Sequence, residues 1–432
     1  MAKIAVLGAG LGGTIVALEL RGKLGNDDTM TIVNKGALYS FVPSNPWVAV
    51  GWRTAKDITV DLKPVMAKRG ITLRDQGAKR VHPDKNQIEL NDGTTVDYDY
   101  LVIATGPELA FDEIPGLGPN GNTDSVCEVG HALISKANFD RLVANPGPVV
   151  VGAAQGASCF GPAYEYAFTL DTALRRAKVR DRVPMTFISP EPYVGHLGLD
   201  GVGDTKGMLE SGMRDRHIKW INNARITKVE PGKMFAEEVN MDGTVQMTHE
   251  LPFAMSMIMP PFRGVPAVFG LEGLTNPRGF IVVDKHQRNP KYPNVFALGV
   301  CVAIPPTGKT AVPVGVPKTG FMIESMSTAI TANIDALLKG GEANAVATWN
   351  AICLADFGDT GLAFIAQPQI PPRNVNWSSE GKWVHLAKIG FEKYFLNKIR
   401  RGHAETFFEN LSLKMLGIDK LKKVTVEKSA NV

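Results

Sequence analysis

The stretch Ile4-Ala-Val-Leu-Gly-Ala-Gly-Leu-Gly-Gly13 decides the fold of this chain. It begins with a short apolar run typical of a buried parallel strand, and a helical run and a second apolar strand at 30–34 follow it. Glycines at the spacing G-x-G-x-x-G let the backbone approach a pyrophosphate at a helix N-terminus, so this β-α-β unit predicts dinucleotide binding. The three glycines of that spacing are Gly8, Gly10 and Gly13.

The residues that follow the second strand depart from the usual pattern. An acidic side chain normally stands there and binds ribose hydroxyls, whereas this chain has Asn34 and Lys35. Two interpretations are open. Asn34 and Lys35 contact the ribose of a bound dinucleotide, or Asn34 is simply a turn residue.

A second strand-and-glycine turn reads Gly-Pro-Val-Val-Val-Gly-Ala-Ala-Gln-Gly at 147–156. Ala154 and Ala157 stand where later glycines of the motif are expected, so we predict a second Rossmann-like domain with a weakened nucleotide site. Two further apolar runs are predicted strands, at 97–106, which ends in Ala-Thr-Gly, and at 292–299.

Length and composition set limits on the molecule. The 432 residues, 44% of them apolar, suffice for two or three domains, and a net charge of +4 does not indicate nucleic-acid binding. No apolar run approaches the roughly 20 residues that cross a bilayer, and we expect no export signal. The cysteines lack the close spacing of a metal site, so we expect no metal; they are Cys127, Cys159, Cys301 and Cys353.

The order of these signatures resembles the two-dinucleotide-binding-domain flavoproteins, whose fold is glutathione-reductase-like. That resemblance implies FAD on the first unit, held also by Thr105, Gly106 and Gly299, although the family's aspartate after the last glycine is replaced by Val300. We therefore expect an α/β chain with two Rossmann-like domains and a C-terminal amphipathic helical region for membrane attachment. The expected boundaries are 1–110 with 280–345 for FAD, 111–279 for the second domain and its cysteines, and 346–432 for the C-terminal region.

Further motifs are similar to sulfide:quinone oxidoreductases over nearly the whole chain. They are Phe41–Trp47, Cys127, Ala157–Tyr166, Gly195–Leu197, Pro317–Gly320 and Trp349–Cys353. The resemblance implies oxidation of sulfide by a cysteine redox centre, with zero-valent sulfur or polysulfide as product and a membrane quinone as electron acceptor.

By this resemblance the redox pair is Cys159 and Cys353. Attack of HS⁻ on the bridged pair would leave a persulfide on one cysteine and a thiolate on the other. Independently of the resemblance, Cys159 should lie near a helix N-terminus, which lowers a thiol pKa. Cys127 matches a third family cysteine, with a role in sulfur transfer or as a flavin tether, or is a plain buried thiol; Cys301 is expected to be a core residue.

Proton transfer needs groups that titrate near neutral pH. His131, His196 and Glu165 lie close in sequence to the cysteine segments and are candidates, with purely structural roles as the alternative. Lys318 precedes a predicted helix that begins near Gly320. It is expected to stabilise an anionic reduced flavin, the alternative being a solvated lysine.

The C-terminal region is aromatic and basic, and Trp383–Arg401 alternates apolar and basic residues at helical spacing. Apolar groups on one side and cations on the other suit an interfacial helix on anionic lipid, although a helix packed on the core has the same pattern. The resemblance places the quinone between Phe391 and Phe408 and beside Pro43. We expect peripheral, monotopic attachment to the cell membrane; a homo-oligomer is compatible with the sequence.

Three other functions remain open on the sequence. A type II NADH:quinone oxidoreductase shares the fold but needs an intact second glycine motif and has no use for Cys159 or Cys353. A flavocytochrome sulfide dehydrogenase subunit shares the cysteines but should lack the basic aromatic tail. A non-catalytic flavin-bearing sulfur carrier is the third.

Overall fold

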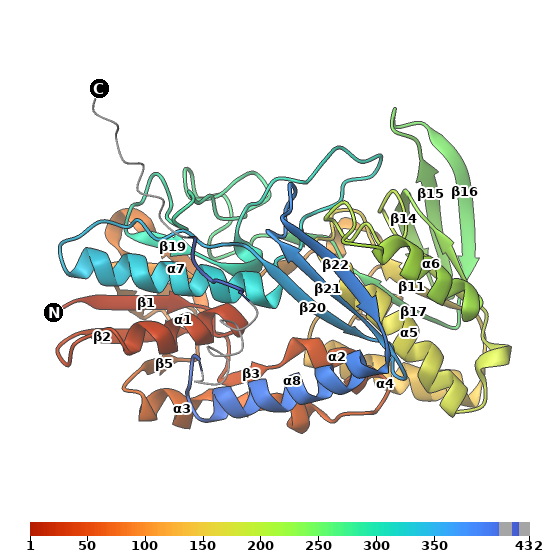
Figure 1. Cartoon of the computed structure of the whole chain (residues 1–432), viewed down its shortest axis with the longest axis horizontal. Helices are drawn as coiled ribbons and strands as arrows, with labels where there is room; N and C mark the ends of the chain where they lie inside the picture. Colours follow the sequence, from red (N-terminus) through yellow and green to blue (C-terminus); the bar gives the residue numbers. More distant parts are fainter. Residues whose placement is uncertain (406–416, 423–432) are drawn as a thin grey trace.

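The computed structural model describes residues 1–405 and 417–422, and its N-terminal unit is built on a five-stranded parallel sheet (Figure 1). The strand order is β19-β9-β1-β2-β5. The bounds are β1 Lys3–Leu7, β2 Thr29–Val33, β5 Thr72–Arg74, β9 Tyr100–Ile103 and β19 Val295–Ala297. Because β19 returns to this sheet after the whole second unit, the unit is discontinuous in sequence; the predicted boundaries at 110, 280 and 345 stay a prediction.

The two faces of this sheet are covered by different layers, as the alternation of strand side chains requires. Ile4 and Val6 of β1 belong to the core cluster that includes residues of α1 and α7, and these two helices run side by side along the sheet (Figure 1). Ala5 and Leu7 belong to a second cluster, shared with a three-stranded antiparallel sheet. The bounds are α1 Leu11–Arg21, α7 Gly320–Leu338, β6 Ala78–His82, β7 Gln87–Leu90 and β8 Thr95–Asp97.

The predicted second unit is also present. Its parallel sheet has the order β13-β12-β11-β17, and residues of an antiparallel sheet β14-β15-β16 pack against one face of it (Figure 1). Its strands are β11 Val149–Ala153, β12 Met185–Ile188, β13 Ile218–Ile221, β14 Ala224–Glu230, β15 Lys233–Val239, β16 Val245–Pro252 and β17 Met255–Met259. Its helices are α4 Val129–Ala144, α5 Gly161–Arg176 and α6 Thr205–Asp215.

The C-terminal region contains the predicted helix but begins with a sheet that the sequence analysis missed. Strands β20, β21 and β22 form an antiparallel sheet, and β20 packs against α5, α7 and α8 (Figure 1). The bounds are β20 Ala351–Asp356, β21 Gly361–Gln367, β22 Val375–Glu380 and α8 Lys382–Arg400. Smaller elements complete the chain: β3 Leu38–Ser40, a 3₁₀ turn Val42–Ser44, α2 Asn45–Ala49, β4 Thr59–Asp61, α3 Leu62–Lys68, β10 Glu108–Leu109 and β18 Phe262–Arg263.

In residues 1–405 and 417–422, none of the helices combines the length and the apolar character needed to cross a bilayer. The C-terminal region packs onto the two α/β units through α8 and the β20–β22 sheet. Its longest described helix, α8, carries charged side chains on its buried side.

Gly152 of β11 tests the close packing of the second sheet. A Cβ there would lie 1.9 Å from the carbonyl oxygen of Ile188 on β12, so we expect Gly152→Ala to lower the free energy of unfolding by about 1–3 kcal/mol through overpacking. Gly130→Ala on α4, where a Cβ meets nothing within 4 Å, is the control and should be neutral or stabilising. Urea unfolding of the two variants makes the comparison, and equal midpoints would contradict the expectation.

Candidate active site

The predicted cofactor residues gather at one edge of the N-terminal sheet. Gly8 follows β1, Thr105 and Gly106 follow β9, and Gly299 follows β19. These strands are parallel, so their carboxyl ends share an edge, and ligands bind at that edge in open α/β sheets.

The first glycine turn is tight at two positions and open at the third. Gly8 has a φ of +105°, and a Cβ there would lie 2.4 Å from the carbonyl oxygen of Ala104. A Cβ at Gly13 would lie 1.9 Å from the carbonyl oxygen of Gly8. At Gly10, which caps α1 without any side-chain hydrogen bond, a Cβ would meet nothing within 4 Å. The N-terminus of α1 therefore presents backbone N–H groups to open space, which fits a pyrophosphate.

Asn34 braces this turn. Its Oδ1 accepts a hydrogen bond from the backbone N–H of Ala9 at 3.0 Å, and its Nδ2 donates to the carbonyl of Gly36 at 3.0 Å. These bonds favour the interpretation of Asn34 as a turn residue, while Lys35 is exposed beside it. A ribose contact by either residue stays a prediction.

The second glycine turn is filled by protein groups. Ala154 is fully buried. The Gln155 side chain accepts from the N–H of Ile226 at 3.0 Å and donates to its carbonyl at 2.8 Å. The N–H of Gly156 donates to the carbonyl of Pro313 at 3.2 Å. Groups that would otherwise face a nucleotide are thus used within the protein, which agrees with the weakened site expected from the sequence.

Three cysteines from separate segments share one site. Cys159 stands two residues before α5, Cys353 lies on β20, and Cys127 precedes α4. All three are free and partly buried, and Cys159 lies within electrostatic range of both other thiols. The Cys127 thiol also contacts the sulfur of Met259 at 3.9 Å. The fold thus brings together the cysteines that the resemblance assigned to sulfur chemistry.

The fourth cysteine lies apart from this group in its contacts. Cys301 is fully buried, and its thiol donates to the carbonyl of Leu298 at 3.1 Å. That environment is the one expected for a small core residue.

The thiols are less acidic than the sequence suggested. Burial raises the pKa of Cys159 and of Cys353 to about 12. The lowering expected from the nearby helix N-terminus is therefore wrong, because desolvation of the thiolate outweighs it. Each thiol has a lysine that acts in the opposite direction, Lys318 on Cys159 and Lys388 on Cys353.

Glu165 and Lys388 form a buried ion pair beside these thiols. Glu165 lies on α5 and Lys388 on α8, and both side chains are almost fully buried. Burial raises the pKa of Glu165 to about 7, against the lowering effect of the Lys388 ammonium. Glu165 also acts on the thiols of Cys159 and Cys353. Of the predicted proton-transfer groups, it is therefore the one that the structure connects to the redox pair.

A second buried carboxylate links this ion pair to the surface. Asp356, at the end of β20, accepts from Trp47 Nε1 at 2.7 Å and contacts His385 Nδ1 at 2.7 Å. The backbone of Asp356 also acts on Glu165 and lowers the pKa of that carboxyl against the larger effect of burial. His385 lies on α8 and is partly exposed. Trp47, Asp356 and His385 therefore fix β20 and α8 around Glu165.

The two predicted histidines have contacts of their own. The His131 ring packs edge-on to Phe111 at 5.7 Å, and burial lowers its pKa below the ordinary value. His196 Nδ1 accepts from the N–H of Gly198 at 3.2 Å, and burial lowers its pKa too. Neither ring is among the groups that act on the three thiols. These contacts favour structural roles, and proton transfer by either histidine stays a prediction.

Lys318 is half-buried rather than fully solvated. It precedes α7, whose first residue, Gly320, is the predicted one. Burial lowers the pKa of Lys318 to about 8, and its neighbours include the thiols of Cys301 and Cys159. Among the residues that the structure describes, no carboxylate lies within ion-pair distance of it. A partly desolvated cation without a carboxylate partner fits an anionic ligand group at this place.

The exposed side of α8 carries both apolar residues and cations, the cations being Lys382, Lys393 and Arg400. Trp383, Leu386 and Phe391 are 48%, 67% and 43% exposed, whereas Lys388 and Lys398 are buried. Phe391 lies 5.9 Å from the ring of Phe41, in the 41–47 motif that also holds the exposed Pro43. Phe408 lies outside the described residues.

Comparisons with known proteins agree with this geometry. A family model described as pyridine nucleotide-disulphide oxidoreductase matches residues 2–315. The sulfide-quinone reductase of Aquifex aeolicus (strain VF5) is 42% identical over 419 residues, which cover 96% of this chain and 95% of that protein. The chain belongs to the sulfide:quinone oxidoreductases. The mouse mitochondrial sulfide:quinone oxidoreductase is 25% identical over 337 residues, covering 75% of this chain and 70% of the relative.

Solved structures show the same relationship at the level of the fold. The crystal structure of the Aquifex aeolicus sulfide:quinone oxidoreductase superimposes with a TM-score of 0.93 at 40% identity, covering 98% of this chain and 97% of that one. NDH2 of Plasmodium falciparum, solved with NADH, gives a TM-score of 0.70 at 13% identity, covering 98% and 100%. That second likeness concerns the fold alone.

Lys388, Asp356 and His385 belong to the buried site of this sulfide:quinone oxidoreductase, but the sequence analysis did not identify them as candidates. A signal for Lys388 was present, since it lies four residues after the buried Val384 and seven before the buried Phe395, on one stripe of a helix. No comparable signal existed for Asp356, because β20 was not predicted.

The Glu165–Lys388 pair yields a stability prediction. Lys388→Met leaves a buried carboxylate without its partner, so we expect a loss of about 3–5 kcal/mol in the free energy of unfolding. The double variant Glu165→Gln/Lys388→Met removes both charges and should recover most of that loss. Urea unfolding of Lys388→Met, Glu165→Gln and the double variant measures the coupling energy between the two side chains. Losses that add in the double variant would contradict a direct pairing.

Proposed function

We propose that this chain oxidises sulfide to zero-valent sulfur or polysulfide through Cys159 and Cys353 and passes the electrons through FAD to a membrane quinone. The observation that carries the proposal is that these two thiols, one just before α5 and one on β20, lie within electrostatic range of each other and of Glu165. The names of the relatives, sulfide-quinone reductase and sulfide:quinone oxidoreductase, support sulfide and quinone as the substrates.

The residues at the carboxyl edge of the N-terminal sheet fit FAD. Open space over Gly10 at the start of α1 suits its pyrophosphate, with Gly8 and Gly13 closing the turn. The half-buried cation of Lys318 suits the negative charge of a reduced isoalloxazine. When bound, FAD supplies a two-electron acceptor that a quinone can reoxidise.

The sulfur chemistry starts from the cysteine pair in its oxidised form, joined directly or through sulfur. HS⁻ attacks one sulfur of the bridge, a new S–S bond forms as the old one breaks, and a persulfide and a thiolate result. The thiolate is costly here because burial raises both thiol pKa values to about 12. Lys318 beside Cys159 and Lys388 beside Cys353 are the cations that stabilise it. Because the high thiol pKa values still make the thiolate costly, it is short-lived, and this favours prompt transfer of the electron pair to the flavin.

Glu165 and Cys127 take supporting parts in the proposal. A carboxyl with a pKa of about 7 exchanges protons at neutral pH, and Glu165 lies beside both thiols, so it is the proposed proton-transfer group. Cys127, within range of Cys159, is placed to accept sulfur from it or to tether the flavin. The persulfide sulfur can thus leave along the cysteines while protons leave through Glu165.

The acceptor site is proposed at α8 and the 41–47 segment. Phe391 there packs with Phe41 and Phe395 at 5.9 and 5.7 Å, and part of its ring is exposed for stacking on a quinone. Pro43 is exposed in the same segment. The exposed apolar residues of α8, together with its exposed Lys382, Lys393 and Arg400, support peripheral attachment to the cell membrane, where a lipid-soluble quinone is found.

The NADH:quinone alternative is disfavoured by the second glycine turn. Gln155 and Gly156 are bonded within the protein, and that function offers no role for the buried thiols. The third alternative, a sulfur carrier without catalysis, would have no use for a buried carboxyl such as Glu165, whose pKa burial raises to about 7.

Serine variants of the pair test the proposal directly. In anaerobic stopped-flow experiments, sulfide should bleach the flavin absorption of the wild-type protein, and quinone should restore it. Cys159→Ser or Cys353→Ser should slow the bleaching by roughly 10³-fold or more, because each removes a covalent partner. Dithionite should still reduce both variants, and Cys301→Ala serves as the matched control. Bleaching by NADH but not by sulfide would sink the assignment.

Membrane attachment is tested on the exposed side of α8. Leu386→Glu places a charge at a side chain that is 67% exposed, and we expect about tenfold weaker binding to anionic lipid vesicles in co-sedimentation. Met247→Glu, on the exposed strand β16 away from α8, is the control and should bind as the wild type does. Equal loss in both variants would argue against this surface.

A further inference from the structure

Helix α5 holds the turn after β20 through side chains along one stripe. Thr169 Oγ1 donates to the carbonyl of Asp356 at 3.3 Å, and Thr172 Oγ1 donates to the carbonyl of Phe357 at 2.8 Å. Arg176 Nη2 donates to the carbonyl one residue further on, at 2.9 Å. Successive backbone carbonyls of the turn are thus bound by successive positions of the helix, which fixes the register between the two.

Packing enforces the same register. The ring of Phe168 on α5 stacks on Phe357 with a centroid distance of 4.1 Å. Gly358 has a φ of +86°, and a Cβ there would lie 2.6 Å from the Trp52 ring and 2.9 Å from Thr172 Cβ. The turn therefore cannot slide along α5 without a steric clash or a lost hydrogen bond.

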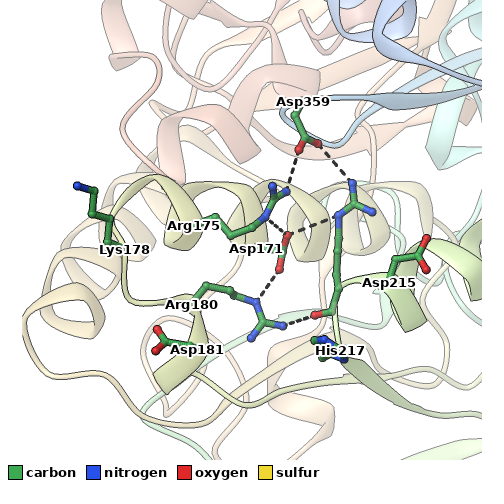
Figure 2. Close-up of a pocket in the computed structure, with 9 residues that line it drawn as sticks. Asp171, Arg175, Lys178, Arg180, Asp181, Asp215, His217 and Asp359 are labelled. Carbon is green, nitrogen blue, oxygen red and sulfur yellow. Dashed lines mark hydrogen bonds and ion pairs between the residues drawn. The ribbon is translucent and has the colours of Figure 1, made fainter.

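An arginine cluster closes the far end of this contact. Figure 2 shows Asp171 between Arg175 and Arg180, with Asp359 above them. Asp171 is 1% exposed and accepts from Arg175 Nε at 2.8 Å and Arg180 Nε at 2.6 Å. Arg175 also binds Asp359 at 2.9 Å, and Arg216 does so at 3.3 Å. These side chains line a hollow of about 680 Å³, in which the guanidinium groups are paired with aspartates.

The redox cysteines lie at the opposite end of the same contact. The backbone of Asp356 acts on Glu165, and from this point β20 runs back to Cys353 while α5 runs back to its start, two residues after Cys159. Three residues of strand span about 10 Å, and the first turn of a helix spans about 5 Å. A shift of the turn along α5 would therefore move Cys353 relative to Cys159 by a similar distance.

We infer that Thr169, Thr172, Arg175, Arg176 and Asp359, here called the α5 clamp, are positioning residues that set the separation of Cys353 from Cys159. The inference rests on the proposed function in taking these cysteines as the redox pair. The clamp touches neither thiol, and it acts through the rigid strand and helix that carry them. Its role is to give the sulfur bridge a fixed span between segments far apart in the sequence.

The double variant Thr169→Val/Thr172→Val removes both hydroxyl donors at nearly constant volume. In the holoenzyme, bleaching by sulfide should slow by roughly 10- to 100-fold, because small misplacement of reacting groups has effects of that size. Reduction by dithionite and reoxidation by quinone should stay within twofold of wild type. Thr169→Val/Thr172→Ser keeps a hydroxyl at position 172. Its bleaching by sulfide should therefore be faster than that of Thr169→Val/Thr172→Val and equal to that of Thr169→Val alone. Thr275→Val, which removes a hydroxyl bond to the carbonyl of Leu271 elsewhere, is the control.

A second readout measures the thiol separation itself. Dibromobimane forms two C–S bonds as two bromides leave, so it bridges thiols that lie close together. Peptide mass spectrometry gives the ratio of bridged Cys159–Cys353 to singly alkylated product, and this ratio should fall at least fivefold in the double variant and in Asp359→Asn. The latter changes a partly exposed side chain and covers the case in which the double variant does not fold.

Wild-type rates and wild-type bridging ratios in both variants would overturn the clamp. Failure of the proposed function is distinguishable, because wild-type protein would then show no sulfide bleaching, or Cys353→Ser would retain it, while the bridging ratio still reports the geometry.

Discussion

The buried ion pair between Glu165 and Lys388 is the constraint on which the rest of the site depends. It joins α5 of the second unit to α8 of the C-terminal region, with β20 between them. A charge buried without its partner is strongly destabilising, so these elements are stable only when docked together. Cys353 lies on β20 and Cys159 stands two residues before α5, so the proximity of the two thiols is a consequence of that docking.

The same principle orders the remainder of α8. Lys398 pairs with Glu324 of α7, and Glu392 pairs with Arg53 at 2.9 Å and accepts from Ser44. The helix thus carries charges on its buried side, each matched by a different segment of the chain. Because charge pairs need a definite geometry, they specify how α8 sits more sharply than apolar contacts alone. Its apolar Trp383, Leu386 and Phe391 are left exposed on the outside.

The parts of this protein that the sequence predicted well are those with local physical causes. The turn at Gly8–Gly13 requires glycine for steric reasons within a few residues, and α7 begins at Gly320 as expected. The sheet of β20 was missed because its pairing and its burial against α5 come from distant residues. The acidity of Cys159 was misjudged for the same reason, since a helix N-terminus is visible in the sequence and desolvation is not. Meeting of the three cysteines followed from resemblance, not from spacing.

Charge balance in the buried site indicates where a further negative charge will be stable. Glu165 and Lys388 neutralise each other, and protonated thiols add no charge. Lys318 has no carboxylate partner among the described residues, and burial already lowers its pKa to about 8. An anion near it relieves that cost, whether the charge is on sulfur or on a cofactor at the edge of the first sheet. The two lysines therefore differ in their surroundings: the buried Lys388 pairs with Glu165, whereas the half-buried Lys318 has no carboxylate partner among the described residues.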